Sequence, residues 1–206
     1  MLKRTSIDFV NKTLKSNPNW KILDIGCGYR PNPYATVIAD IQDFSNYYKD
    51  KKFVKISEKN LPFKNKEFDF VISSHVIEHV EDFEFFIKEL ERISSKGYIE
   101  LPSRLGDNLV FENEKDHLWW FKYDDINNSL IASRKNQNLE PFLTVSMGKL
   151  FEDIYRESLV IELFWENEIN FIIDERIRNE NLNKVSFFKI IRKYLSKKFR
   201  TVIRRK

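Results

Sequence analysis

Cysteine is nearly absent from this sequence, and long apolar runs are absent altogether. The single cysteine, Cys27, has no partner for a disulfide within the chain, which suits a reducing compartment. No stretch approaches the roughly 18 apolar residues of a membrane-spanning helix, and the first residues lack the apolar run of a cleaved signal peptide. Over 206 residues, these absences predict one soluble cytoplasmic domain whose core needs no disulfide or structural metal.

Acidic residues are missing from the C-terminal segment, residues 184–206. It holds ten basic residues, leaving 25 basic and all 31 acidic residues to residues 1–183. Apolar side chains recur at helical spacing between the basic ones, which is typical of helices that lie on a membrane surface. We therefore divide the chain into a domain, residues 1–183, and a basic amphipathic helix or tail, residues 184–206, with an anionic membrane as its candidate partner. The alternatives are packing of this helix on the domain or a solvated tail, and binding of nucleic acid, because polybasic helices bind phosphates generally.

Apolar periodicity predicts an α/β domain. Helices are expected over residues 7–14 and 80–93, and five short apolar runs predict strands at residues 21–25, 36–40, 53–56, 68–73 and 97–101. Most of these runs are continuous rather than alternating, as in parallel strands covered on both faces. The second half predicts a hairpin of residues 117–123 with 129–133, a helix over 143–157, and a hairpin of 159–165 with 169–174.

A glycine turn follows the first of these strands in the sequence LDIGCG, residues 23–28. Asp40 ends the next strand, where a carboxylate can accept hydrogen bonds from both ribose hydroxyls of a nucleotide-like cofactor. Only 11 residues, Tyr29–Ala39, separate Gly28 from Asp40, and the third glycine of a dinucleotide-binding fingerprint would fall at Pro31. The first crossover helix is therefore expected to be shortened or absent, which favours a cofactor without a phosphate to bind at a helix N-terminus.

The ordered set LDIGCG, VIAD, LPFKNKEFDFVISSHVIEHV and GYIELP closely resembles class I S-adenosylmethionine-dependent methyltransferases over roughly residues 20–102. The resemblance implies a Rossmann-like mixed sheet, mostly parallel with antiparallel C-terminal strands, and S-adenosylmethionine as the cofactor. The implied cofactor contacts are Asp24, Gly26, Cys27 and Gly28 at the methionine moiety, Asp40 with Ile41 beside it at the ribose, Ser57 and Glu58 at the adenine edge, and Ser73 and Ser74 near the methionine amino group. Family members often have Asp where Ser57 stands, so a weaker adenine contact is expected here.

Three histidines are the candidates for chemistry on the methyl acceptor. His79 and His117 are predicted as catalytic residues, because a hydroxyl acceptor benefits from a base. His75 and His79 would share a face if both lay on one helical turn, and packing near the sheet edge is the alternative role for each. No third residue has the spacing of a metal ligand, so no metal is expected. Trp119, Trp120 and Phe121 would either stack on an acceptor or cover the sheet.

The sequence thus predicts a methyltransferase acting on a small-molecule or glycan acceptor, most simply at oxygen, and peripheral at the inner membrane face if the tail binds lipid. The Asn-Pro-Pro-Tyr type sequence of nucleic-acid amino-methyltransferases is absent, so nucleic acid is not an expected partner. The alternatives are a methyltransferase acting on RNA or protein and a cofactor-binding scaffold without catalysis. The oligomeric state is left open.

Overall fold

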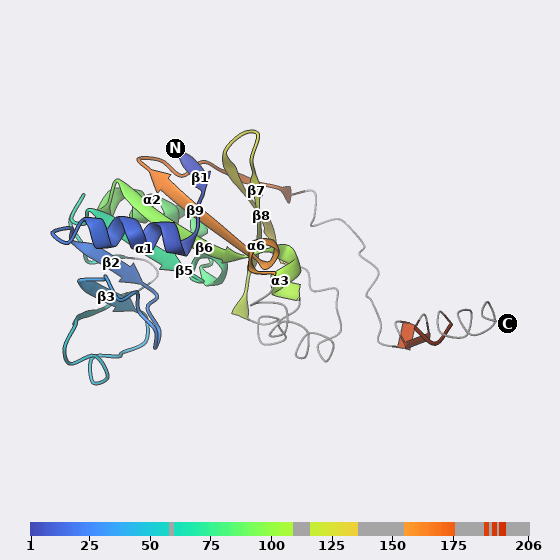
Figure 1. Cartoon of the computed structure of the whole chain (residues 1–206), viewed down its shortest axis with the longest axis horizontal. Helices are drawn as coiled ribbons and strands as arrows, with labels where there is room; N and C mark the ends of the chain where they lie inside the picture. Colours follow the sequence, from blue (N-terminus) through green and yellow to red (C-terminus); the bar gives the residue numbers. More distant parts are fainter. Residues whose placement is uncertain are drawn as a thin grey trace.

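The computed structural model describes residues 1–57, 60–108, 116–135 and 155–175, together with 188, 189, 191, 192, 194, 195 and 196. Two sheets dominate the described chain (Figure 1). The main sheet has the order β1-β9-β6-β5-β2-β3-β4, and a smaller sheet has the order β10-β8-β7. Their bounds are β1 Leu2–Arg4, β2 Ile22–Ile25, β3 Val37–Asp40, β4 Lys52–Lys55, β5 Phe70–Ser74, β6 Lys96–Pro102, β7 Trp119–Asp124, β8 Ser129–Arg134, β9 Val160–Glu166 and β10 Phe171–Ile173.

The five strands β2 to β6 run parallel to one another, which confirms the predicted mostly parallel α/β sheet. Every residue of β2 and β3 is buried, because apolar layers cover both faces of the sheet. This explains why these strands are continuous apolar runs in the sequence.

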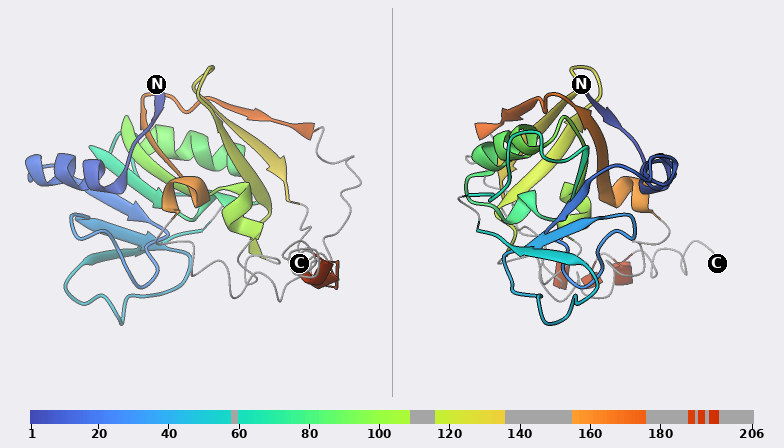
Figure 2. Two further views of the ribbon diagram at one scale, coloured as in Figure 1. Left: turned by 45° about the vertical axis from the view of Figure 1, so that its right-hand side comes forward. Right: turned by 90° about the vertical axis from the view of Figure 1, so that its left-hand side faces the viewer.

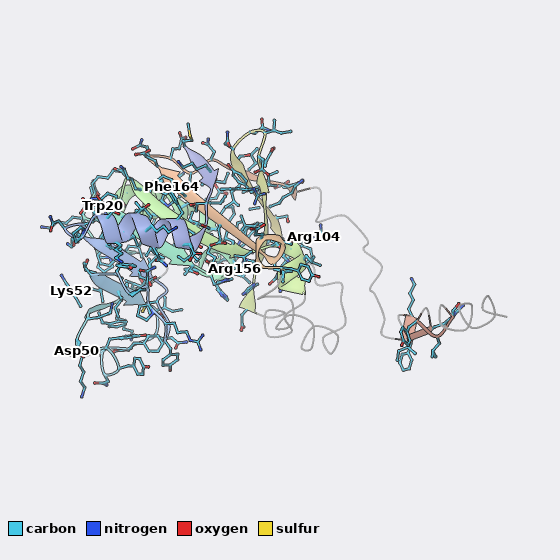
Figure 3. The ribbon with its side chains drawn as sticks, in the orientation of Figure 1. Trp20, Asp50, Lys52, Arg104, Arg156 and Phe164 are labelled. Carbon is cyan, nitrogen blue, oxygen red and sulfur yellow. The ribbon has the colours of Figure 1, made fainter. Side chains whose placement is uncertain are left out.

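Helices lie on opposite faces of the main sheet (Figure 2). On one face α1, Ile7–Ser16, packs Val10 and Leu14 against the sheet, and Trp20 and Phe164 lie on this same side (Figure 3). On the other face α2, Phe83–Ile93, shares a larger core with residues of β7 and β8. The shorter helices are η1 Ile77–His79, α3 Arg104–Asn108 and α6 Arg156–Leu159.

The helix predicted over residues 80–93 begins three residues later than expected. The side chain of Asp82 accepts a hydrogen bond from the backbone N–H of Phe85 at 3.0 Å and so caps α2. The preceding residues form the separate η1 turn, and this break places His79 outside α2.

No helix connects β2 to β3, so the predicted loss of the first crossover helix is confirmed. The connection from β3 to β4 lacks a helix as well, although parallel strands are usually joined through one. Aromatic side chains cover this end of the sheet instead. They meet edge to face, with ring centroids 4.8 to 6.3 Å apart, and comprise Tyr29, Phe44, Tyr47, Tyr48 and Phe53.

The first predicted hairpin is confirmed as β7 and β8, whereas the second is wrong. The strand β9 lies between β6 and β1 and is antiparallel to both, so neither of its edges is available to β10. The chain turns at Asn167, which has a φ of +68°, and β10 instead pairs parallel to β8 in the smaller sheet. The sequence reading also missed β1, whose three residues complete the far edge of the main sheet.

Two predicted helices fall largely outside the described residues. Of the helix expected over 143–157, only residues from 155 onward are described, and α6 begins at Arg156. In the tail, the seven described residues are helical and exposed, including Phe188, Tyr194 and Leu195. Among the helices that the structure describes, none has the length and apolar character needed to cross a bilayer.

Candidate active site

A cavity of about 400 Å³ opens at the carboxyl ends of β2, β3 and β5. The strand order reverses beside β2, since β3 lies on one side of it and β5 on the other, and α/β sheets bind ligands at such a point. Five predicted site residues line the cavity: Gly26, Asp40, Ile41, Ser57 and His79. The lining residues that the sequence reading did not assign to the site are Gln42, Ile56, His75, Val76, Val80, Phe86 and Asp116.

The glycine turn after β2 has a left-handed backbone at Gly26, with a φ of +73°, and at Gly28, with a φ of +48°. A Cβ added at Gly26 would lie 2.2 Å from Cγ2 of Val76, so this glycine also permits a close approach of two segments. A Cβ at Gly28 would meet no atom within 4 Å. The first glycine is therefore required by conformation and by space, and the second by conformation alone.

Asp40 is held in place by the backbone of this turn. Its Oδ2 accepts from the N–H of Gly28 at 3.0 Å, and its Oδ1 accepts from the N–H of Gln42 at 2.9 Å. Each carboxylate oxygen keeps a further lone pair, so the side chain can still accept from two ribose hydroxyls. The apolar side chains of Ile41, Ile56 and Phe86 provide a lining suited to an adenine ring. These residues fit the adenosyl part of S-adenosylmethionine.

Several predicted site residues do not line this cavity. They are Asp24, Cys27, Gly28, Ser73, Ser74 and His117, whereas Glu58 lies outside the described residues. The Oδ2 of Asp24 accepts from the N–H of Asn32 at 2.6 Å and so holds the connection from β2 to β3. Burial raises the pKa of Asp24 to about 6 and that of the Cys27 thiol to about 12, so the thiol stays neutral and weakly nucleophilic at pH 7.

His75 follows β5 with a φ of +54° and does not share a helical turn with His79. Its Nδ1 lies 3.2 Å from Oε1 of Glu78 and its Nε2 lies 3.1 Å from Oε1 of Glu100. Burial lowers the pKa of His75, but the hydrogen bonds to these two carboxylates outweigh it and raise the pKa to about 10. His75 is therefore an imidazolium in the wall of the cavity at neutral pH.

Glu100 contacts two positively charged side chains, His75 and Arg156. Its Oε2 accepts from Nη2 of Arg156 at 2.6 Å and from the hydroxyl of Tyr98. Burial raises the pKa of Glu100, but the contacts with His75, Tyr98 and Arg156 outweigh it and lower the pKa to about 2. This charged network joins β6, α6 and the end of β5 behind the cavity.

The imidazoles of His79 and His117 are in contact, with ring centroids 4.4 Å apart and an interplanar angle of 89°. His79 lines the cavity and its Nδ1 lies 3.0 Å from the carbonyl oxygen of Asp116. His117 is buried behind it, and its Nδ1 lies 2.5 Å from Oδ1 of Asp107. The structure thus brings the two predicted catalytic residues together, with only His79 facing the cavity.

Asp107 is a buried carboxylate that the sequence reading missed. Besides His117, it contacts Nζ of Lys135 at 2.9 Å and accepts from Nε1 of Trp120 at 2.6 Å. Burial raises the pKa of Asp107, but the contacts with His117 and Lys135 outweigh burial. The net shift of the pKa is therefore downward, and the group is ionised. No local sequence signal marks this role, because its partners come from distant segments.

Trp119, Trp120 and Phe121 are buried in β7, and the packing of Trp119 and Phe121 in the larger core supports their role as cover for the sheet, whereas Trp120 lies outside that core. The ring of Phe83 in α2 meets Trp119 and Phe121 edge to face at 4.6 and 5.9 Å. They do not line the cavity beside the glycine turn.

Among the described residues, one group of three has the side chains to hold a metal ion. Ligand atoms of Glu78, His79 and His117 lie within 4.8 Å of one another. Spacing along the chain did not reveal this group, because His117 comes from a segment beyond β6 and is brought to η1 only by the fold.

The sequence matches one family model and a curated relative. A model described as a methyltransferase domain matches residues 23–99. A relative named ubiquinone biosynthesis O-methyltransferase, from Pelagibacter ubique, is 28% identical over 124 residues, covering 53% of this chain and 50% of that protein. The chain therefore spans about half the length of this curated relative.

Solved structures are similar over part or most of the chain. The alignment with YcgJ from Bacillus subtilis covers 47% of this chain and 50% of YcgJ, with 18% identity and a TM-score of 0.41. The alignment with PH0226 from Pyrococcus horikoshii covers 79% of this chain and 89% of PH0226, with 18% identity and a TM-score of 0.46. The family model identifies residues 23–99, which carry the glycine turn and Asp40, as a methyltransferase domain, and these residues fit S-adenosylmethionine as the cofactor.

Proposed function

We propose that this chain transfers the methyl group of S-adenosylmethionine to a hydroxyl oxygen of a small-molecule or glycan acceptor. One observation carries the proposal: a single cavity is lined both by the glycine turn and Asp40, which fit the cofactor, and by the exposed imidazole of His79. The name of the Pelagibacter relative, an O-methyltransferase, supports oxygen as the acceptor atom.

The reaction that this arrangement supports is an in-line displacement. The acceptor oxygen forms a bond to the methyl carbon while the carbon–sulfur bond breaks, and the sulfonium becomes a neutral thioether. Holding the oxygen and the methyl group in line supplies much of the rate enhancement. His79, with His117 behind it, is the proposed contact for the acceptor hydroxyl.

A binding titration tests the cofactor. We expect saturable binding of S-adenosylmethionine and of its demethylated product, S-adenosylhomocysteine, and none of NAD. Asp40→Ala should weaken both adenosyl ligands by at least about tenfold, since a charge-assisted hydrogen bond contributes about 1.5–3 kcal/mol. Asp43→Ala, an exposed carboxylate three residues away, is the matched control. Failure of both adenosyl ligands to bind would refute the proposal.

Turnover tests the acceptor. A panel of phenols, aliphatic hydroxyls and glycans is incubated with the chain and methyl-labelled S-adenosylmethionine, with an amine series beside it. Labelled ether products with hydroxyl acceptors, reduced by His79→Ala, are the expected result. Label in the amines alone would assign nitrogen instead, and tight cofactor binding without transfer to any acceptor would favour a non-catalytic scaffold.

We also propose that residues 184–206 bring the enzyme to an anionic membrane surface on the cytoplasmic side. Helical positions repeat every 100°, so the exposed side chains of Phe188, Ile191, Tyr194 and Leu195 gather on one side of the tail helix. Lys189 lies outside this apolar side and Arg192 lies at its border. The ten basic residues of the segment, without an acidic one, complement anionic lipid.

Vesicle flotation tests this second proposal with the full chain. The protein should float with phosphatidylserine-containing vesicles, and less with neutral phosphatidylcholine vesicles. Phe188→Ser with Leu195→Ser, and separately Lys189→Gln with Arg192→Gln, should each reduce flotation. Equal flotation of all variants, or no flotation of the wild type, would refute membrane binding by residues 184–206. Neither result would bear on the proposed methyl transfer.

A further inference from the structure

We propose that Glu78, His79 and His117 form a binding site for a divalent transition-metal ion at the acceptor end of the cavity. Their ligand atoms lie within 4.8 Å of one another. A small movement of these side chains would place each ligand atom at about 2.0–2.2 Å from one ion. Two of the three side chains are buried, and the third, His79, faces the cavity.

Glu78 supplies an independent indication of a ligand. Its side chain is fully buried, and while Oε1 contacts His75, Oε2 has no hydrogen-bond partner. A buried carboxylate oxygen without a partner is costly. A cation bound between Glu78 and the two imidazoles would satisfy this oxygen.

The two imidazoles are oriented as metal ligands are. The carbonyl of Asp116 can only accept a hydrogen bond, so His79 carries its proton on Nδ1 and keeps a lone pair on Nε2. Oδ1 of the Asp107 carboxyl group likewise lies 2.5 Å from Nδ1 of His117. A carboxylate or carbonyl on the far nitrogen is the usual support of a metal-bound histidine.

Backbone contacts hold the ligands together before any ion binds. The N–H of Leu118 donates to the carbonyl oxygen of Glu78 at 2.8 Å, which ties the segment of His117 to η1. Nε1 of Trp119 donates to the carbonyl oxygen of Val80 at 3.0 Å, a second contact between the same two segments. The site is therefore built into the fold rather than assembled from mobile side chains.

The ligand set selects the class of ion. Two imidazoles with one carboxylate suit Zn²⁺ or another first-row transition ion, whereas Mg²⁺ prefers oxygen ligands. Three protein ligands leave a coordination position for an exogenous group, as in catalytic rather than structural zinc sites. Only His79 faces the cavity, so that position would open there.

A role for the ion in methyl transfer rests on the proposed function, whereas binding of the ion does not. An acceptor hydroxyl bound to the ion would lose its proton to solvent water more readily. Its oxygen would then form the bond to the methyl carbon as the carbon–sulfur bond breaks. In this arrangement the two imidazoles act as ligands, and the ion replaces a general base.

Direct titration of the chelator-treated full chain with Co²⁺ tests the site, because bound Co²⁺ gives visible absorption bands that report its ligands. We expect one Co²⁺ per chain, displaced by Zn²⁺ and not by Mg²⁺. Glu78→Gln, His79→Ala and His117→Ala should each lower the affinity by more than tenfold. Asp107→Asn should lower it by about 10–100-fold, as expected for a group that supports a ligand.

Glu81→Gln is the matched control, since Glu81 is an exposed carboxylate three residues from Glu78 and pairs with Arg134. This variant should bind Co²⁺ as the wild type does. His79→Ala removes an exposed side chain, so it tests the site even if the His117 or Glu78 variant fails to fold.

No bound Co²⁺ or Zn²⁺ in the wild type, or equal affinity in the His79→Ala variant, would overturn the proposal. Binding of S-adenosylhomocysteine is measured on the same chelator-treated protein. Its failure would count against the proposed function alone, and its success without metal binding would count against the metal site alone.

Discussion

At the scale of single residues, the glycine turn shows two different demands on one residue type. Gly26 needs a positive φ and also the space that the Val76 side chain occupies, whereas Gly28 needs only the positive φ. The sequence motif makes the two glycines look equivalent. The structure separates them by the atoms that a side chain would meet.

This difference predicts unequal costs of substitution. Gly28→Ala should reduce the free energy of unfolding by about 1–2 kcal/mol, the cost of a left-handed alanine. Gly26→Ala should cost more than Gly28→Ala and should also weaken S-adenosylhomocysteine binding, because relief of the 2.2 Å contact moves Val76 in the cavity wall. Urea unfolding and ligand titration of both variants measure this, and equal losses of stability would contradict it.

The buried carboxyl of Asp24 predicts a pH dependence of stability. Its folded pKa, about 6, lies above its value of 3.8 in the unfolded chain, so the folded state binds more protons between these values. Stability from this group is present below pH 3.8 and is lost as the pH rises through 6. Asp24→Asn should therefore be more stable than the wild type at pH 8 by up to about 3 kcal/mol, and by much less at pH 4.

The measurement is urea unfolding at both pH values, with Asp43→Asn as an exposed control that should not show this gain at pH 8. A gain of Asp24→Asn that is the same at pH 4 and pH 8 would assign the effect to packing rather than to charge.

At the scale of elements, the far edge of the main sheet depends on a strand of three residues. In β1, Leu2 is fully buried while Lys3 and Arg4 point outward. Its pairing with β9 gives that strand a neighbour on each side, and β10 pairs with β8 in the smaller sheet. A strand of three residues thus closes the far edge of the main sheet.

Leu2→Ala should lower the free energy of unfolding by about 2–4 kcal/mol, because it removes a buried aliphatic side chain and leaves a cavity. Lys3→Ala, in the same strand and exposed, should change it by less than about 0.5 kcal/mol. Thermal or urea unfolding compares the two. A similar small effect of both would show that β1 adds little to the stability of the sheet.

At the scale of the whole molecule, one core joins both sheets. Phe83 in α2 meets Trp119 and Phe121 of β7 and Phe171 of β10 edge to face, with centroids 4.6 to 5.9 Å apart. The same hydrophobic cluster continues into β2, β5 and β6. The described residues up to 175 therefore share one core, whereas the domain boundary at residue 183 lies outside the described residues and stays a prediction.

Phe83→Ala should therefore lower the free energy of unfolding by about 3–5 kcal/mol and shift the unfolding of both sheets together. Amide hydrogen exchange of β5 and β8 measures this, because the two strands lie in different sheets. Faster exchange in β8 with unchanged exchange in β5 would show that the smaller sheet unfolds separately.

The sequence by itself determined the parallel strands, the missing crossover helix and the cofactor end of the site. These follow from local patterns: continuous apolar runs, the glycines at 26 and 28, and Asp40 at a strand end. The short connection between β2 and β3 could be recognised by counting residues. Chain length between two fixed motifs is a local property, and it leaves no room for a helix.

Only the tertiary structure decided the pairing of β9 and β10 and the contact of His79 with His117. The partners of β9, namely β1 and β6, lie far from it along the chain. His117 likewise reaches His79 only because β7 is tied to η1, and the carboxylate of Asp107 meets it from α3. Contacts between distant segments depend on how whole elements pack, so spacing along the sequence carries no record of them.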